Sequence, residues 1–279
     1  MSEADPSNET VTRPRPPWLR ALGRHEPPET VTIAGRLYRR QQHFKHDAFA
    51  ATARYAADHA DASDQVIVKF GRTASVFGVP LSWLGGHLCG KERDVHRRLV
   101  GIEAVPEAVD GLEPPGRPFR HTLVRRYVPG RTLRDHLPDT LPDDFFARLN
   151  ALLDQVHARG IAVMDLNKAE NLLVDETGRP HLIDFQLSVR KRAWAVLPGA
   201  GWWLGVLQGC DRFYVAKQFA RAQPEAFREQ HGDLEAMRPA LTRGWRTFSR
   251  PLRTLRRKLL VSLKVRRGNG NADTEVATV

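Results

Sequence analysis

Cysteine is scarce in this sequence, and so are long apolar runs. Only Cys89 and Cys210 occur among 279 residues, so we expect two free, buried thiols. No signal peptide opens the chain, and a reducing cytosol is the expected compartment. The longest uncharged run, residues 193–210, contains Pro198 and four glycines, whereas a membrane-spanning helix needs about 20 consecutive apolar residues. The sequence therefore predicts no transmembrane helix.

Acidic residues are absent from one long segment near the C-terminus. Residues 238–267 contain eleven Lys and Arg residues and no Asp or Glu, and the remainder is balanced at 32 basic against 32 acidic residues. The net charge of +11 thus belongs to this segment. A field of that sign attracts anionic partners, such as lipid headgroups, nucleic acid or a phosphorylated glycolipid.

The sequence does contain enough apolar residues, 41%, for a sizeable core. Residues 1–29 are rich in proline and charge without periodicity, so we expect a mobile leader and a fold that begins near Val31. Helical spacing predicts helices at 90–100 and 142–159. Apolar runs bounded by polar residues predict strands at 31–40, 44–56, 64–71, 121–133, 171–175 and 180–185. The first three are compatible with an antiparallel sheet, although 44–56 has some helical character. The run 121–133 contains a turn at Pro129-Gly130.

One stretch, GIAVMDLNKAENLLVDETGRPHLIDFQLSV at residues 160–189, carries three oxygen ligands beside apolar runs. Asn171 follows Asp165 by six residues, and Asp184 follows it by nineteen. A general base and two ligands of a hard metal ion suit phosphoryl transfer, because that reaction is catalysed by positioning and by charge neutralisation. The pattern therefore predicts a phosphotransferase site.

These residues resemble the protein-kinase-like superfamily, in particular its bacterial lipopolysaccharide-core (Kdo and heptose) sugar kinases and its RIO-type kinases. The resemblance covers roughly residues 31–190. It rests on the order of Lys69 in VIVKF, Glu92 in GKERDV, the helix at 142–159, Asp165 and Asn171 in DLNKAEN, and Asp184 in IDF. The resemblance implies an α+β fold of two lobes, with a small antiparallel sheet and one helix in the first lobe and a mostly helical second lobe.

The resemblance also implies a role for each residue. Lys69 grips the α- and β-phosphates of ATP and is held by Glu92, for which Glu103 is the alternative. Asp165 orients the acceptor hydroxyl and accepts its proton. Asp184 chelates Mg²⁺ between the β- and γ-phosphates, since a hard cation prefers carboxylate oxygen.

The second metal ligand has three candidates. The superfamily usually places five residue steps between the base and the metal-binding asparagine, whereas this chain has six. A single residue inserted in the loop accounts for the difference. Asn171 is the expected ligand, and Glu170 and Asn167 are the alternatives.

Other departures from the superfamily concern the phosphate loop and regulation. No G-x-G-x-x-G precedes Lys69, so Lys45, His46 and backbone amides are expected to cover the phosphates instead. Val163-Met164 stands where protein kinases carry His-Arg, and no A-P-E follows Asp184. The absence of His-Arg before Asp165 argues against an activation-loop switch, and the absence of A-P-E favours a non-peptide acceptor.

The expected domains follow from these assignments. They are the leader 1–29, a first lobe at 30–124, a second lobe at 125–237 joined through residues 125–130, a basic amphipathic helix at 238–267 and a disordered tail at 268–279. The expected function is ATP- and Mg²⁺-dependent phosphorylation of a hydroxyl, with a sugar of a membrane glycolipid such as lipopolysaccharide core as the preferred acceptor. The alternatives are an atypical serine/threonine protein kinase and a pseudokinase that serves as a nucleotide-binding scaffold.

Two further segments bear on partners. Trp245, Phe248, Leu252, Leu255 and Leu259 lie at helical spacing among arginines, which suits either a basic helix packed on the second lobe or a helix on an anionic membrane surface. Nucleic acid is a less favoured partner, because no known binding module accompanies the charge. The apolar residues 193–209 are expected to be packed core, with a surface that touches a lipid substrate as the alternative.

Overall fold

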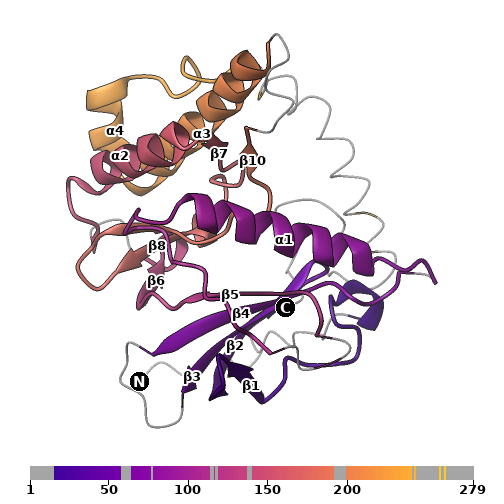
Figure 1. Ribbon diagram of the computed structural model, residues 1–279. Helices are drawn as coiled ribbons and strands as arrows, with labels where there is room; N and C mark the ends of the chain where they lie inside the picture. The colour runs from indigo at the N-terminus through magenta and orange to yellow at the C-terminus, as the bar shows by residue number, and fades with distance from the viewer. Residues whose placement is uncertain are drawn as a thin grey trace, which may run out of the picture.

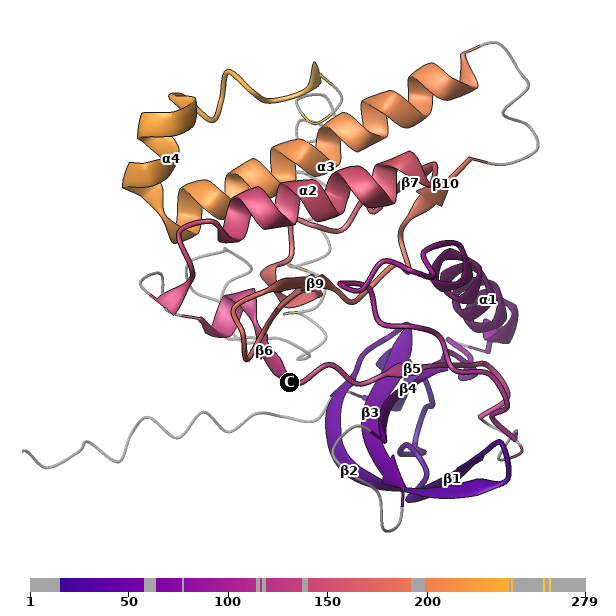
Figure 2. The ribbon, with the colours of Figure 1, turned by 60° about the vertical axis from the view of Figure 1, so that its left-hand side comes forward.

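Five antiparallel strands, in sequence order, form a curled sheet in the first lobe (Figures 1 and 2). The structure is a computed structural model that describes residues 16–57, 64–76, 78–113, 116, 119–136, 140–191, 199–240, 242, 258 and 261. The strands are β1 (Thr30–Ile33), β2 (Arg36–His46), β3 (Ala50–Ala57), β4 (Gln65–Gly71) and β5 (Thr122–Arg126). The expected antiparallel sheet is thereby confirmed.

Two of the predicted strands differ in detail from the structure. Residues 31–40 form two strands rather than one, because Ala34 and Gly35 adopt positive φ angles of 50° and 75° and reverse the chain. Residues 44–56 contain a turn and no helix. Oδ1 of Asp47 accepts hydrogen bonds from the backbone N–H groups of Phe49 (2.7 Å) and Ala50 (2.9 Å), which closes the turn between β2 and β3.

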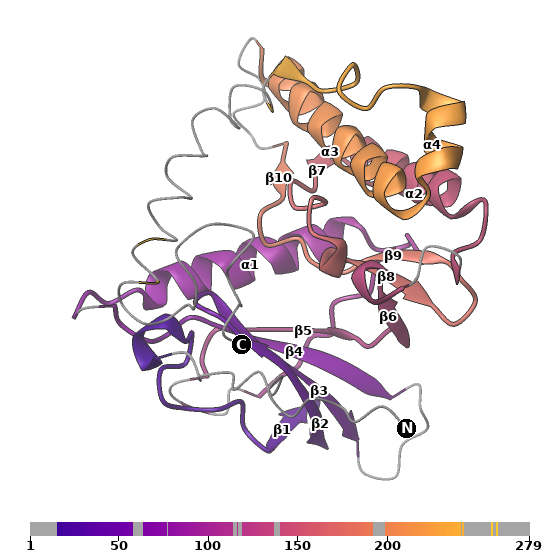
Figure 3. The same ribbon diagram turned by 180° about the vertical axis from the view of Figure 1, so that it is seen from behind.

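Helix α1 (Ser82–Arg98) lies across the sheet, between it and the second lobe (Figures 1 and 3). It begins eight residues before the predicted start at 90. Gly85 makes the close approach possible, because a Cβ atom there would lie 2.1 Å from the carbonyl oxygen of Arg72. The missing side chain of Gly85 thus sets how closely α1, and with it Glu92, approaches β4.

Gly85→Ala is expected to destabilise the protein by about 1–3 kcal/mol, the usual cost of overpacking, since the obstacle is backbone that cannot rotate away. Gly90→Ala in the same helix is the matched control, because its Cβ would meet nothing within 4 Å. Alanine should stabilise the helix there by about 0.5–1 kcal/mol. Urea unfolding of the two variants measures the difference, and equal free energies of unfolding would contradict the packing argument.

The second lobe is mostly helical (Figures 1 and 2). Helices α2 (Phe145–Ala158) and α3 (Ala200–Ala222) pack side by side, and α4 (Pro224–His231) follows α3. The helix predicted at 142–159 is confirmed as α2, and its apolar residues are buried. The short elements of this lobe are β6 (Gly130–Thr132), η3 (Leu133–Asp135), β7 (Ile161–Ala162), η5 (Ala169–Asn171), β8 (Leu172–Asp175), β9 (Pro180–Leu182) and β10 (Val189–Arg190). The α+β fold of two lobes expected from the sequence is confirmed.

The sheets of the second lobe carry the predicted motif. β8 pairs with β6 and with β9, and β7 pairs with β10, all antiparallel. The loop between β7 and β8 contains Asp165 and Asn171, and Asp184 lies two residues after the end of β9. The sequence stretch 160–189 therefore folds into two neighbouring loops at one end of these short strands.

The fold begins earlier than the expected start near Val31. Pro17–Leu19 form a turn of 3₁₀ helix, η2, and the side chains of Ala21 and Leu22 are buried. The guanidinium of Arg72 donates to the carbonyl oxygens of Trp18 (2.9 Å) and Ala48 (2.6 Å). These bonds hold residues 16–22 against the turn between β2 and β3.

Several expectations lie outside the part of the chain that the structure describes. These are residues 1–15 of the leader, nearly all of the basic segment 238–267 and the tail 268–279. Within the described ranges, no helix is both long and apolar enough to span a membrane.

The interpretation of residues 193–209 as packed core is wrong where the structure describes them. Trp202 and Trp203, near the start of α3, are 65% and 51% exposed, residues 204 and 206–209 are half-buried, and full burial starts at Cys210. The first part of this helix projects beyond α2, as Figure 2 shows, so no other described helix packs along it there.

Candidate active site

Lys69 occupies the middle of the site. It lies on β4, its side chain is buried, and its Nζ is 2.8 Å from Oε2 of Glu92 and 3.1 Å from Oδ1 of Asp184. Glu92 comes from α1 and is 1% exposed, and Asp184 comes from the second lobe. Three residues separated by up to 115 positions in the chain therefore meet at one ammonium group. Glu103, the alternative partner, is exposed and lies elsewhere.

The electrostatics of this group keep the ammonium and the aspartate charged. Burial alone would lower the pKa of Lys69, but the carboxylates of Glu92 and Asp184 raise it above its ordinary value. Burial would likewise raise the pKa of Asp184, yet the ammonium groups of Lys69 and Lys45 hold it well below its usual range. Burial, supported by the charge of Asp184, raises the pKa of Glu92 against the opposing effect of Lys69.

Backbone bonds fix the orientation of Asp184. Its Oδ1 also accepts a hydrogen bond from the backbone N–H of Gln186 (3.1 Å), and the N–H of Phe185 points at Oε1 of Glu92 (3.4 Å). Phe185 is fully buried and packs edge-on against the ring of His96 on α1, with ring centroids 5.2 Å apart. The residue after Asp184 thus anchors this loop to α1. The second oxygen of Asp184, Oδ2, is 4.0 Å from Nζ of Lys45 and is left to bind a ligand.

Acid is expected to destabilise the protein through His96. Burial and the nearby charge of Arg125 lower the pKa of His96 to about 4, whereas an unfolded histidine titrates near pH 6.5. Between these two pKa values the unfolded state therefore binds more protons than the folded state. The free energy of unfolding that His96 contributes is lost as the pH falls from about 6.5 to about 4, by about 3 kcal/mol in all.

His96→Asn tests this expectation, because Nδ1 of His96 lies 2.8 Å from the carbonyl oxygen of Pro106 and an asparagine amide can donate there without titrating. Urea unfolding between pH 7 and pH 4 should show a smaller loss of unfolding free energy for this variant than for wild type. His87→Asn, on the exposed face of the same helix, should follow the wild-type curve. Parallel curves for His96→Asn and wild type would contradict the assignment.

Asp165 and Asn171 belong to one connected loop. The side-chain amide Nδ2 of Asn171 donates to the backbone carbonyl of Asp165 (3.0 Å), and Nζ of Lys168 is 2.6 Å from Oδ2 of Asp165. The loop ends in the 3₁₀ turn η5, whose last residue is Asn171. Because Nδ2 is used internally, Oδ1 of Asn171 is the atom available to a metal ion.

The three candidates for the second metal ligand occupy different places. Asn171 and Glu170 both line the same cavity as Lys69 and Asp184. Asn167 is exposed, and its Oδ1 accepts a hydrogen bond from Nζ of Lys217 on α3 (2.6 Å). The geometry therefore favours Asn171 or Glu170 over Asn167.

Asp211 holds the turn before Asp165 and was not predicted from the sequence. This residue of α3 is fully buried, and its two oxygens accept hydrogen bonds from the backbone N–H groups of Val163 and Met164, each at 2.7 Å. Its Oδ2 is also 3.1 Å from Nε2 of His157 on α2. Met164 has a positive φ of 69°, a conformation that costs energy in a non-glycine residue. Asp211 thus stabilises an unfavourable turn directly before Asp165.

Lys45 faces the site, but His46 does not. Lys45 lines the cavity, and its Nζ is also 3.5 Å from Oδ2 of Asp47. His46 points to the opposite side of β2, where Nε2 accepts a hydrogen bond from the backbone N–H of Leu22 (3.0 Å). The expectation that His46 covers the phosphates is therefore wrong, because neighbouring residues of a strand point to opposite faces.

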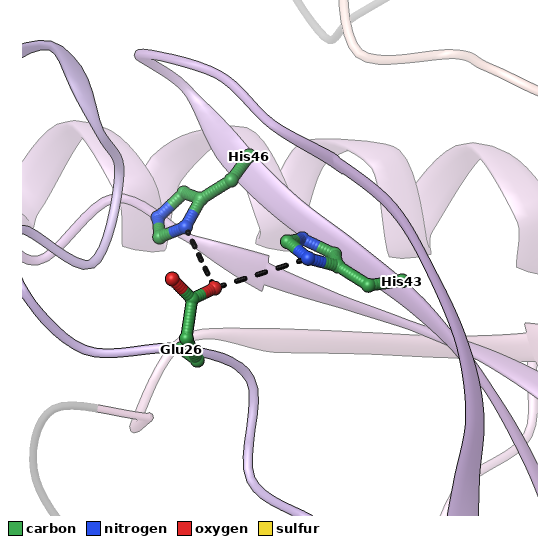
Figure 4. A group of neighbouring side chains, drawn as sticks. All are labelled: Glu26, His43 and His46. Atoms are coloured by element: carbon green, nitrogen blue, oxygen red, sulfur yellow. Dashed lines mark ion pairs between the residues drawn. The ribbon is translucent and has the colours of Figure 1, made fainter. Parts of the chain in front are cut away.

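On that opposite side, His46 belongs to a cluster with His43 and Glu26 (Figure 4). Oε2 of Glu26 lies 3.6 Å from Nδ1 of His46 and 3.8 Å from Nδ1 of His43. Such a set resembles a metal site, but the guanidinium of Arg20 contacts the Glu26 carboxylate and lies 2.8 Å from Nδ1 of His46. An arginine thus already supplies the positive charge, and the cluster ties residues 20–26 to β2.

Lys69, Asp184, Lys45 and Asn171 line a cavity of about 230 Å³, whereas Asp165 is not among its lining residues. The other charged residues of the lining are Glu92, Glu170 and Arg125. Much of the remaining lining is apolar. This part includes Ile67, Leu123, Tyr127, Val128, Leu173 and Ile183. A slot of this kind suits a flat ring attached to a charged tail.

Comparisons with known proteins find similar solved structures only. No family model and no curated protein matches the chain. The chain is similar to the Rio2 kinase from Chaetomium thermophilum, with 21% identity over 62% of this chain and 54% of that one and a TM-score of 0.44. A second structure of that kinase, a complex with ADP, Mg²⁺ and phosphoaspartate, has 19% identity over 74% and 66% and a TM-score of 0.45. This chain therefore spans between half and two thirds of the length of those chains. A RIO-type kinase, expected from the sequence, is thus among the structures that the chain is similar to, and the likeness to lipopolysaccharide kinases stays a prediction.

Proposed function

We propose that this protein is a Mg²⁺-dependent phosphotransferase that moves a phosphoryl group from a purine nucleoside triphosphate to a hydroxyl. The observation that carries the proposal is the meeting of Lys69, Glu92 and Asp184 in a cavity with much apolar lining. A lysine held by a buried glutamate binds phosphate oxygens, and the apolar slot accepts the base. ATP is the nucleotide expected from the sequence.

The donor set fits a magnesium ion. Oδ2 of Asp184 and Oδ1 of Asn171 are oxygen ligands of the kind that Mg²⁺ prefers, and both residues line the cavity. A bound Mg²⁺ would neutralise charge on the β- and γ-phosphates. Lys69 binds the nonreacting phosphates, Lys45 covers them from β2, and Asp165 orients the acceptor hydroxyl and takes its proton.

The proposed acceptor is a sugar hydroxyl of a membrane glycolipid such as lipopolysaccharide core, reached from the cytoplasmic face. The absence of an A-P-E segment after Asp184 argues against a docked peptide. The exposed Trp202 and Trp203 at the start of α3 offer an apolar surface that suits a lipid. An atypical protein kinase is the second choice.

The test uses γ-labelled nucleotide and a cell-envelope extract, with lipid and protein separated afterwards. Label in the lipid fraction supports a glycolipid acceptor, and label in protein alone supports the protein-kinase alternative. Asp165→Asn should lower transfer by about 10²–10⁴-fold, the usual range for loss of a general base. Equal label with wild type and variant would refute the phosphotransferase role.

The ion pair between Lys168 and Asp165 (2.6 Å) favours one other candidate, a nucleotide-binding scaffold without turnover. The ammonium of Lys168 occupies one of the two carboxylate oxygens that would take the proton of the acceptor hydroxyl. This candidate predicts nucleotide binding with no transfer above the Asp165→Asn background. Lys168→Met separates the two functions, because release of Asp165 should restore transfer only if the ion pair is inhibitory.

A membrane contact through residues 238–267 is part of the proposal, because this segment carries the excess positive charge. Sedimentation with anionic liposomes should fall sharply when residues 238–279 are deleted. Unchanged sedimentation would remove the membrane role and leave the phosphotransferase role intact.

A further inference from the structure

Arg125 is a cation inside the cavity that the proposed mechanism does not use. It lies on β5 opposite Ile67 of β4, and the next residue on the same face, Leu123, lies opposite Lys69. All four side chains line the cavity. Because residues two apart on a strand are about 7 Å apart, Arg125 lies that far along the sheet from the position opposite Lys69, beside the apolar slot.

The guanidinium of Arg125 is available to a ligand. Burial lowers the pKa of Arg125, and the charges of Glu92 and Asp184 oppose this effect, so the group stays charged as arginines in proteins do. Among the described residues, none accepts a hydrogen bond from this guanidinium. Arg125 is half-buried and lines the cavity, so its donors are open to a ligand there.

The chemistry of the donors defines which base fits. An arginine offers donors only. Adenine presents an acceptor at N7 and an amino donor at position 6, whereas a 6-oxopurine presents acceptors at both N7 and O6. A guanidinium in the plane of the base therefore pairs with both atoms of a 6-oxopurine and repels the amino group of adenine.

We propose that Arg125 selects a 6-oxopurine nucleotide, so that guanosine triphosphate rather than ATP is the preferred phosphoryl donor. The inference rests on the proposed function, since it concerns the base of the same nucleotide. Glu92 is held by Lys69 at 2.8 Å, so Arg125 is not needed as its partner. The proposal differs at this one point from ATP, the phosphoryl donor expected from the sequence.

Calorimetric titration with the Mg²⁺ complexes of GTP, ITP and ATP tests the proposal on the full chain. ITP shares O6 with GTP and lacks the 2-amino group, so it isolates the contact at position 6. A bidentate arginine–base pair discriminates by about 1–3 kcal/mol, which is about 5- to 150-fold in affinity. Wild type should therefore bind GTP and ITP more tightly than ATP by such a factor.

Variants at two neighbouring positions separate base selection from other effects. Arg125→Met should bring the three affinities to within about threefold of one another, a residual difference of under 1 kcal/mol, and Arg125→Lys, which lacks the bidentate fork, should reduce the preference as well. Arg126→Met is the matched control, because Arg126 is exposed and pairs with Glu107 (3.8 Å) outside the cavity. It should retain the wild-type preference.

Three results would overturn the assignment. Wild type that binds ATP at least as tightly as GTP and ITP contradicts base selection. An equal loss of affinity for all three nucleotides in Arg125→Met makes Arg125 a phosphate ligand instead. Wild type that binds none of the three contradicts the proposed function and this inference with it, whereas the first two results leave that function standing.

Discussion

Asp184→Asn is expected to lower phosphoryl transfer by on the order of 10³-fold, about 4 kcal/mol of transition-state stabilisation, because the carboxylate is the proposed main ligand of Mg²⁺. The substitution keeps the shape of the side chain, and the amide oxygen can still accept the hydrogen bond from Gln186. What it removes is the negative charge. Steady-state assays over a range of Mg²⁺ concentrations measure the effect, and excess Mg²⁺ should restore little activity.

Asp175→Asn is the matched control for this prediction. Asp175 is the last residue of β8, and hydrogen bonds from Thr177, His181 and the backbone N–H of Arg179 outweigh burial and lower its pKa. It does not line the cavity. Both substitutions therefore remove a stabilised carboxylate, but only Asp184→Asn should abolish transfer. A similar loss of activity in both variants would indicate that stability rather than metal binding explains the effect.

Asp211→Ala is expected to lower the free energy of unfolding by about 2–6 kcal/mol, since each of two orphaned backbone donors costs about 1–3 kcal/mol. The unsupported turn at Met164 should then relax toward negative φ and move Asp165. A displacement of about 1 Å at a reacting group costs on the order of 10² in rate. Urea unfolding and initial rates report the two effects separately.

Asp211→Asn is the milder variant, because one oxygen remains to accept one of the two backbone N–H groups, and about half of the destabilisation is expected. Asp154→Asn is the control on the same pair of helices. Asp154 forms an exposed ion pair with Arg212 (2.9 Å), and exposed pairs contribute about 0–1 kcal/mol. Destabilisation by Asp154→Asn as large as that by Asp211→Ala would contradict the role given to the buried carboxylate.

The sequence predicted the elements whose periodicity is strong. The helix now seen as α2 carries apolar residues at helical spacing along its whole length, and β4 is a short apolar run with polar residues on both sides. The start of α1 was missed because glycines at 85, 86 and 90 lower helix propensity, although Gly85 is required by the close packing on β4. At Gly85, close packing on β4 therefore outweighs the low helix propensity of glycine.

The candidate site was predictable only where a motif carried it. Lys69, Glu92 and Asp184 are brought together by the structure, and their order along the chain had pointed to them. Arg125 lies beside Arg126 at the end of β5, and Asp211 lies beside Arg212 in α3. A sequence pattern cannot indicate which of two such neighbours will face a buried group. Lys45 and His46 were predicted together because they are neighbours, but a strand sends adjacent side chains to opposite faces.

Arg72 holds the turn between β2 and β3 in place through hydrogen bonds to the carbonyl oxygens of Ala48 and Trp18. Because this turn is already ordered before a nucleotide binds, it loses little conformational entropy on binding. Nucleotide exchange should then proceed without a large rearrangement above the phosphates. Shortening the chain beyond residue 17 should loosen this turn and weaken nucleotide affinity from a distance.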